Sequence, residues 1–118
     1  MVSLADRLAE TVGAIASAAR TSAPRSEVRL YGCAALGTFR VLLGGAGDAE
    51  VAAFTARVRQ RIAATGGSAV IARGTAALRR AVDPWGPVEP GAFALMRALR
   101  DEFDPGRVLN PGRYVGGL

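Results

Sequence analysis

The sequence predicts a small α+β domain in which helices cover one face of a small antiparallel or mixed sheet. Apolar residues recur at helical spacing in several segments, and two short extended runs follow each other in the chain. A third extended run comes after a later helix, so one strand would join the sheet across a helix. With 118 residues, of which 50% are hydrophobic and 21% charged, the chain has room for one core and should fold.

The first helix is expected over residues 3–20. Ser3 suits the N-cap position, and Asp6 follows three residues later, as in a capping box. Residues 21–26 include Pro24, which ends the helix. The positions expected to face the core are Leu4, Leu8, Val12, Ile15 and Ala19.

Residues 27–33 and 36–43 have the pattern of two strands, and their separation by Ala34 and Ala35 predicts a hairpin. Two alanines make a poor hairpin turn, so the turn does not fix the register. Because side chains alternate along a strand, each strand has one apolar face. The apolar faces carry Val28, Leu30, Phe39, Val41 and Leu43, and the opposite faces carry Arg29, Tyr31, Thr38 and Arg40.

After a glycine-rich turn, Asp48 is expected to cap a second helix, which Gly66 and Gly67 close. Its apolar stripe is Val51, Phe54, Val58 and Ile62, with Arg57, Gln60 and Arg61 turned outward. The remaining elements are a third strand over 68–73, a short helix over 75–82, a connector over 83–91, a last helix over 92–103 and an irregular tail. A hairpin plus a strand reached across a helix is typical of a ferredoxin-like layer.

The charge balance does not favour a nucleic-acid partner, although the formal net charge is +5. All fifteen basic residues are arginines, and they are scattered except for the cluster of Arg57, Arg59 and Arg61. Only 6% of the residues are aromatic, fewer than a base-stacking surface needs. The arginine-only usage is more typical of a coding bias than of a binding surface.

The lack of histidine removes the commonest general base and most zinc sites, and we expect no metal in this chain. Cys33 is the single cysteine, so it cannot form an internal disulfide, and it is expected to be a small buried hydrophobe. Asp6, Arg7 and Glu10 interrupt any apolar run typical of a signal peptide, and no stretch is long enough to span a membrane. These features predict a cytoplasmic protein.

The C-terminal segment contains two closely spaced proline–glycine turns, Pro105-Gly106 and Pro111-Gly112. Such turns hold a loop in one shape because little conformational entropy is left to lose. Asn110 directly precedes a proline and is therefore expected to be extended. Before the turns, the helix residues expected to face a core are Phe93, Leu95, Met96 and Leu99. A stiff loop of this kind suits the presentation of main-chain amides and one side chain to a partner surface.

The run FDPGRVLNPGR, residues 103–113, resembles the DP-x-x-x-LNPG-K/R ending of the C-terminal cap domain of FAD-linked oxidases. With VDPWGP and LMRALRDEFDP before it, the chain is most similar to the FAD-binding E subunit of glycolate oxidase. The resemblance covers roughly residues 26–118 and is strongest from Asp83 onward. It implies the C-terminal portion of an FAD-dependent 2-hydroxy acid oxidoreductase, with a catalytic flavin subunit and an iron–sulfur subunit as partners.

In that family the ending closes against the flavin domain, which makes Asn110 and Arg113 the cofactor-binding candidates. The alternative is that Asn110 only caps the turn and Arg113 pairs on the surface. Trp85, Phe93 and Met96 are interpreted as core and docking residues.

The open face of the family's cap sheet roofs the flavin and the substrate, which makes Arg29, Tyr31 and Arg40 the substrate-binding candidates. An arginine fork on that face would hold the carboxylate of a 2-hydroxy acid bidentately. The alternative is a solvated sheet face. No residue is singled out as a catalytic base.

Two features depart from the family's pattern. Gly44, Gly45 and Gly47 follow a strand without the GxGxxG spacing, and the histidines of D-lactate-type relatives have no counterpart. The flavin-binding domain is therefore expected to be absent from this chain, which should bind FAD only together with such a domain and should not be active alone. The chain is then a single cap domain, with a body over 1–82 and a connector, helix and tail over 83–118.

Two other hypotheses stay open. The chain could be a stand-alone interaction or dimerisation module derived from such a cap, because an unroofed sheet face would expose apolar and aromatic surface to a second copy. It could also be a small ferredoxin-like domain that binds another carboxylate or metabolite, although no residue pattern singles one out.

Overall fold

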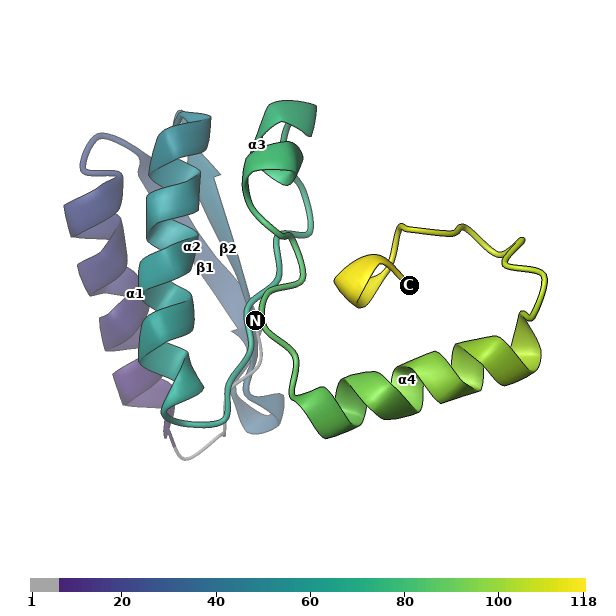
Figure 1. Cartoon of the computed structure of the whole chain (residues 1–118). Coiled ribbons are helices and arrows are strands. Elements are labelled where there is room, and N and C mark those ends of the chain that lie inside the picture. The colour runs from purple at the N-terminus through teal and green to yellow at the C-terminus, as the bar shows by residue number, and fades with distance from the viewer. Residues whose placement is uncertain (1–6) are drawn as a thin grey trace. The chain divides into compact units, whose positions relative to one another are not determined.

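The computed structural model describes residues 7–118, and their fold is α+β. These residues form four α-helices and one two-stranded antiparallel sheet (Figure 1). Contacts within the chain divide it into two compact units, Met1–Pro84 and Trp85–Leu118. Each unit is described by itself below.

Helix α1 (Leu8–Ser22) buries Thr11, Ile15, Ala18 and Ala19. The predicted stripe was therefore correct at Ile15 and Ala19 but wrong at Val12, which is exposed. The helix contacts its neighbours through the row of Thr11, Ile15 and Ala18, whose i, i+4, i+7 spacing runs beside the predicted row. The predicted cap at Ser3 and Asp6 and the core position at Leu4 lie outside the described residues.

The predicted hairpin is confirmed. Strands β1 (Glu27–Cys33) and β2 (Thr38–Gly44) pair antiparallel, with Val28 opposite Leu43. The turn is longer than two alanines: Ala34–Leu36 form a 3-10 turn, and Gly37 follows with φ of 59°. A two-residue hairpin loop needs positive φ, which alanine disfavours. The residue with positive φ in this turn is therefore Gly37 rather than one of the alanines. The second strand therefore begins at Thr38 rather than at residue 36.

Helix α2 (Asp48–Ala63) follows Gly47, whose N–H donates to the Glu50 carboxylate at 2.8 Å. Asp48 was predicted as the N-cap but is the first helical residue, and its carboxylate accepts a hydrogen bond from the Thr75 hydroxyl at 2.6 Å. Phe54, Val58 and Ile62 are buried as predicted, whereas Val51 is half-buried.

The core of the first unit lies between the helix pair and one face of the hairpin. Helices α1 and α2 lie side by side over the sheet (Figure 1). The buried cluster is Ile15, Ala18, Ala19, Phe54, Val58 and Ile62, against which Leu30, Val41, Leu43 and Ala69 pack. The apolar face of the hairpin therefore meets the helices, as the alternation of side chains predicted, except at Val28, which is exposed.

Residues 68–73 were predicted to form a third strand, and this is wrong beyond a single bridge at Ser68. Their backbone groups bond elsewhere. The Ile71 N–H donates to the Pro84 carbonyl at 2.8 Å, and the Ala69 carbonyl accepts from the Arg59 guanidinium at 2.9 Å. Because these groups are already satisfied, they do not extend the ladder. The sheet of the described residues keeps two strands, and no ferredoxin-like topology is shown.

Helix α3 (Ala76–Ala81) confirms the predicted short helix. The Thr75 hydroxyl caps it by accepting from the Leu78 N–H at 3.0 Å, and the Leu78 side chain is buried. Cys33 was expected to be buried but is exposed, because it ends β1 on the sheet face away from the helices, opposite Thr38.

In the second unit, helix α4 (Pro90–Phe103) begins two residues earlier than predicted. The Glu89 carboxylate caps it, accepting from the Gly91 and Ala92 N–H groups at 2.8 and 2.7 Å. Pro90 occupies the first helical position, where no amide donor is needed. Phe93 and Met96 are half-buried, but Leu95 and Leu99 are 62% and 50% exposed, so their predicted core position is wrong. No residue of α4 is fully buried in the part of the chain that the structure describes.

Among the helices of the described part of the chain, none has both the length and the apolar character that a bilayer crossing requires.

Candidate functional site

The tail after α4 is held by one carboxylate. The Asp104 side chain accepts from the Val108 and Leu109 N–H groups at 2.9 and 3.0 Å, and the Asp104 carbonyl accepts from the Arg107 N–H at 3.0 Å. The backbone hydrogen bonds from Leu109 and Val108 lower the pKa of Asp104, with Arg100 adding to the effect. The first proline–glycine turn is therefore tied to the end of the helix by an ionised carboxylate.

The second turn brings the two cofactor-binding candidates together. The Arg113 N–H donates to the Asn110 carbonyl at 3.3 Å, with Pro111 and Gly112 as the central residues. Gly112 has φ of 74°, which the third position of a type II turn requires. Asn110 has φ of 50°, so its predicted extended conformation is wrong. Asparagine is one of the few residues that adopt the left-handed region readily, which explains how it fits there.

Asn110 and Arg113 border one open hollow of about 380 Å³, together with Leu109 and Tyr114. Neither the Asn110 amide nor the Arg113 guanidinium forms a hydrogen bond or ion pair within residues 7–118. Both polar groups are therefore available to a ligand or a partner surface at this hollow.

Aromatic packing holds the C-terminal end of the tail. The rings of Trp85 and Tyr114 meet edge to face with centroids 4.9 Å apart, and Val115 is buried. Gly116 has φ of 61°, and a side chain there would clash with the ring of Phe93. Trp85 and Phe93, interpreted from the sequence as core and docking residues, take part in packing the tail.

The three substrate-binding candidates lie on the open face of the hairpin, away from the helix pair. Tyr31 and Arg40 are directly opposite each other across the two strands, and both are exposed. Arg29 lies two residue pairs further along the ladder, opposite Leu42, and its guanidinium donates to the Glu27 carboxylate at 2.7 Å. Arg40 has no such partner among the described residues, so it is the better placed of the two arginines to receive an anion.

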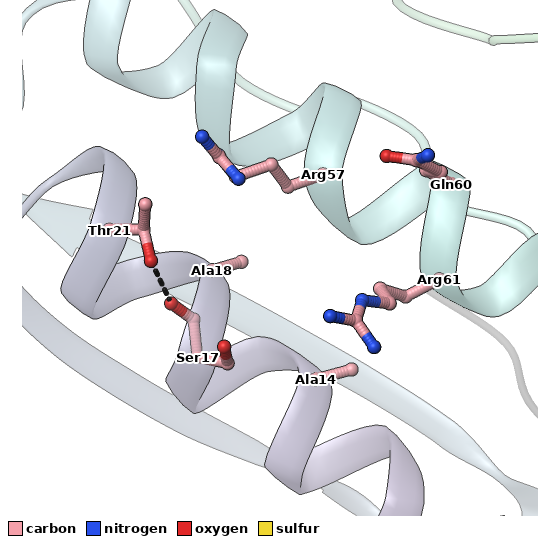
Figure 2. A pocket seen from close by; sticks show the side chains of 7 residues that line it. All are labelled: Ala14, Ser17, Ala18, Thr21, Arg57, Gln60 and Arg61. Carbon is pink, nitrogen blue, oxygen red and sulfur yellow. Dashed lines mark hydrogen bonds between the residues drawn. The ribbon is translucent and has the colours of Figure 1, made fainter.

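Sequence reasoning missed a further polar groove, between α1 and α2. Figure 2 shows the arginines of α2 facing the small residues of α1, where the Thr21 hydroxyl donates to the Ser17 carbonyl at 3.0 Å. The groove measures about 350 Å³. Its lining residues are Ala14, Ser17, Ala18, Thr21, Arg57, Gln60 and Arg61. The available signal was the i, i+4 spacing of Arg57 and Arg61, which places both on one helix face.

Within residues 7–118, no three histidine, cysteine, aspartate or glutamate side chains lie close enough to hold a metal ion together. Comparison with known proteins adds no assignment: no protein-family model matches the chain, and searches among curated proteins and solved structures found no similar one.

Proposed function

We propose that this chain is the C-terminal cap portion of an FAD-dependent 2-hydroxy acid oxidoreductase of the glycolate oxidase type, in which it roofs the flavin and substrate. The observation that carries the proposal is the tail hollow, where the Asn110 amide and the Arg113 guanidinium have no partner among the residues that the structure describes. The DP-x-x-x-LNPG-R run that resembles the family's ending is the same run that forms this hollow. The proposal includes a ferredoxin-like cap sheet that extends beyond the hairpin.

The residues at the hollow fit the edge of a flavin but not a whole FAD. An amide and a guanidinium suit the carbonyl and nitrogen edge of a flavin ring or a phosphate, and the exposed ring of Tyr114 suits stacking. The hollow is open on one side and lined by four residues, whereas cofactor sites enclose most of the ligand. Asn110 and Arg113 would therefore close a site that a flavin-binding domain builds.

When bound, FAD supplies the group that accepts a hydride from the 2-hydroxy acid. The part of this chain would be to orient the substrate and to exclude water. On the open sheet face, Arg40 would hold the substrate carboxylate with its planar fork, and Tyr31 opposite it would donate a hydrogen bond. Arg29 would take part only after release from Glu27. A catalytic flavin subunit and an iron–sulfur subunit that accepts electrons are the proposed partners.

The test is affinity purification of the tagged chain from its native host. We expect the purified complex to carry FAD and to reduce an artificial electron acceptor when glycolate or another 2-hydroxy acid is added. The isolated chain mixed with FAD should retain no yellow colour after gel filtration. A native complex that contains no flavin and oxidises no 2-hydroxy acid would contradict the proposal.

Two substitutions test the tail within that complex. Asn110→Gly removes the amide but keeps a residue that tolerates φ of 50°, and Arg113→Gln removes the charge. Both should lower the flavin content or the rate of the complex by about tenfold, since each removes one polar contact to the cofactor. Arg73→Gln is the matched control, because Arg73 is exposed and lies outside both candidate sets. If all three variants had the same flavin content and the same rate, the tail would not be part of the cofactor site.

One observation favours a second candidate function, a stand-alone interaction or dimerisation module. Leu95, Leu99 and Phe103 repeat every four residues along α4 and are all at least half exposed. Val108 and Leu109 in the tail are exposed as well. A row of exposed large apolar side chains along one helix is typical of a protein contact. Sedimentation of the isolated chain separates the hypotheses: a stable dimer that Leu99→Asp converts to a monomer, with no flavin in the native complex, would favour the module.

A further inference from the structure

We propose that the groove between α1 and α2 is a binding site for the phosphate group of a small phosphate ester. The groove belongs to the first unit, and it shares no lining residue with the tail hollow or with the open sheet face. The proposal is independent of the flavin assignment, because none of its residues was a candidate for flavin or 2-hydroxy acid binding.

The charge of the groove is the first reason. Arg57 and Arg61 line it from successive turns of α2, and none of the lining residues within 7–118 is a carboxylate. Like charges four residues apart on a helix destabilise it slightly, so an anion between the two guanidinium groups would relieve a repulsion. A dianion balances two positive charges, whereas a single carboxylate balances one.

The lack of internal partners is the second reason. Within residues 7–118, neither Arg57 nor Arg61 forms a hydrogen bond or an ion pair. Other arginines of the chain are engaged: Arg29 pairs with Glu27, and Arg59 donates to three backbone carbonyls. The two guanidinium groups at the groove therefore keep their donors for an external acceptor.

The shape and the neutral donors are the third reason. The alanines of α1 that line the groove, Ala14 and Ala18, leave room for a ligand beside the arginines (Figure 2). Ser17 and Gln60 offer a hydroxyl and an amide at the same groove. The Thr21 hydroxyl donates its hydrogen bond to the Ser17 carbonyl, so it is not a donor to an anion. Two forked cations with neutral donors nearby match a tetrahedral anion with several acceptor oxygens.

The experiment is calorimetric titration of the full chain with inorganic phosphate and with methyl phosphate, at an ionic strength fixed with chloride. We expect saturable binding of one ion per chain, at least about tenfold tighter for phosphate than for acetate or glycolate, because each further charge-assisted contact contributes about a factor of ten or more. The same ligands should raise the thermal midpoint of the chain, since they bind the folded state alone.

Variants locate the site. Arg57→Gln and Arg61→Gln should each weaken phosphate binding about tenfold or more, and Arg61→Lys, which keeps the charge but loses the fork, should weaken it less. Arg73→Gln removes the same charge elsewhere on the unit and should leave binding unchanged. The groove arginines are exposed, so the variants should fold as the parent does, which circular dichroism checks.

Three outcomes would overturn the proposal. They are the absence of saturable phosphate binding by the parent chain, an equal effect of Arg73→Gln and Arg61→Gln, and a preference for single-stranded RNA whose affinity grows with oligomer length and falls steeply with salt. The last outcome would identify the groove as part of a polyanion surface.

Discussion

The guanidinium of Arg59 donates to the carbonyl of Pro84 at 2.9 Å and thereby ties α2 to the last residue of the first unit. The same side chain donates to the carbonyls of Asp83 and Ala69, both at 2.9 Å. Partial burial lowers the pKa of Arg59, although the Asp83 carboxylate opposes that shift. Arginine still remains charged throughout the ordinary pH range. Arg59 is therefore a structural cross-link, whereas Arg57 and Arg61 beside it in the sequence turn to the groove.

Arg59→Met should destabilise the first unit by about 1–3 kcal/mol, because it removes three hydrogen bonds from a charged donor while keeping the apolar stem. Urea unfolding followed by circular dichroism measures the loss. Arg57→Met in a phosphate-free buffer is the control and should change the unfolding free energy by no more than about 0.5 kcal/mol. Equal losses in the two variants would show that Arg59 is no cross-link.

The packing of α1 gives a second prediction. Ile15 is 2% exposed and Val12 is 37% exposed, although both belonged to the stripe expected from the sequence. Ile15→Ala should lower the unfolding free energy by about 2–5 kcal/mol, whereas Val12→Ala should change it by less than about 1 kcal/mol. Thermal unfolding of the two variants compares them directly. A larger loss for Val12→Ala would mean that α1 turns another face to the core.

The buried face of an element was predicted correctly where a periodic pattern of apolar residues coincided with a single buried surface. The alternation in 27–33 and 36–43 predicted the apolar face of the hairpin, and the spacing of Phe54, Val58 and Ile62 predicted the buried face of α2. Such patterns reflect only which face of the element is buried, so they can be recognised within the segment itself.

The sequence-based predictions failed where backbone groups bond to residues that are distant in the sequence. The apolar run over 68–73 has the composition of a strand, but its Ala69 carbonyl accepts from Arg59 and its Ile71 N–H donates to Pro84. Asn110 and Arg113 were candidates only through the family resemblance, and the residue pattern predicted an extended Asn110 rather than its positive φ. The groove of Arg57 and Arg61 needed the packing of α1 against α2, which no single segment reveals.

The tail offers a prediction on glycine. Gly116 and Gly117 both have positive φ, but only at Gly116 would an added methyl group meet another side chain, the ring of Phe93. Gly117→Ala should therefore lose only about 1 kcal/mol from backbone strain, whereas Gly116→Ala should lose more and displace the tail. The fluorescence of Trp85, which packs against Tyr114, reports that displacement. Indistinguishable spectra for the two variants would contradict the packing of Phe93 on the tail.

The last prediction concerns pH and the carboxylate that holds the first turn. Backbone N–H groups of Leu109 and Val108 lower the pKa of Asp104, so the folded tail favours the ionised form. The stabilisation is thus fully present above the ordinary aspartate pKa of about 3.9 and is lost as the pH falls through the lower pKa of the folded tail. The amide NMR signals of Val108 and Leu109 should shift together with a midpoint below that ordinary value.

Asp104→Asn should abolish the common titration of the Val108 and Leu109 amide signals and leave both at chemical shifts typical of a disordered chain at neutral pH. The reason is that the asparagine side chain is a weaker hydrogen-bond acceptor than the carboxylate. Glu102→Gln is the control, since Glu102 is exposed and forms no hydrogen bond within residues 7–118, and it should leave the titration in place. A common midpoint at or above the ordinary aspartate pKa would mean that Asp104 does not hold the turn. In that case Asn110 and Arg113 would have no stiff support, and the tail would lose the preorganisation on which its proposed contact with a flavin domain depends.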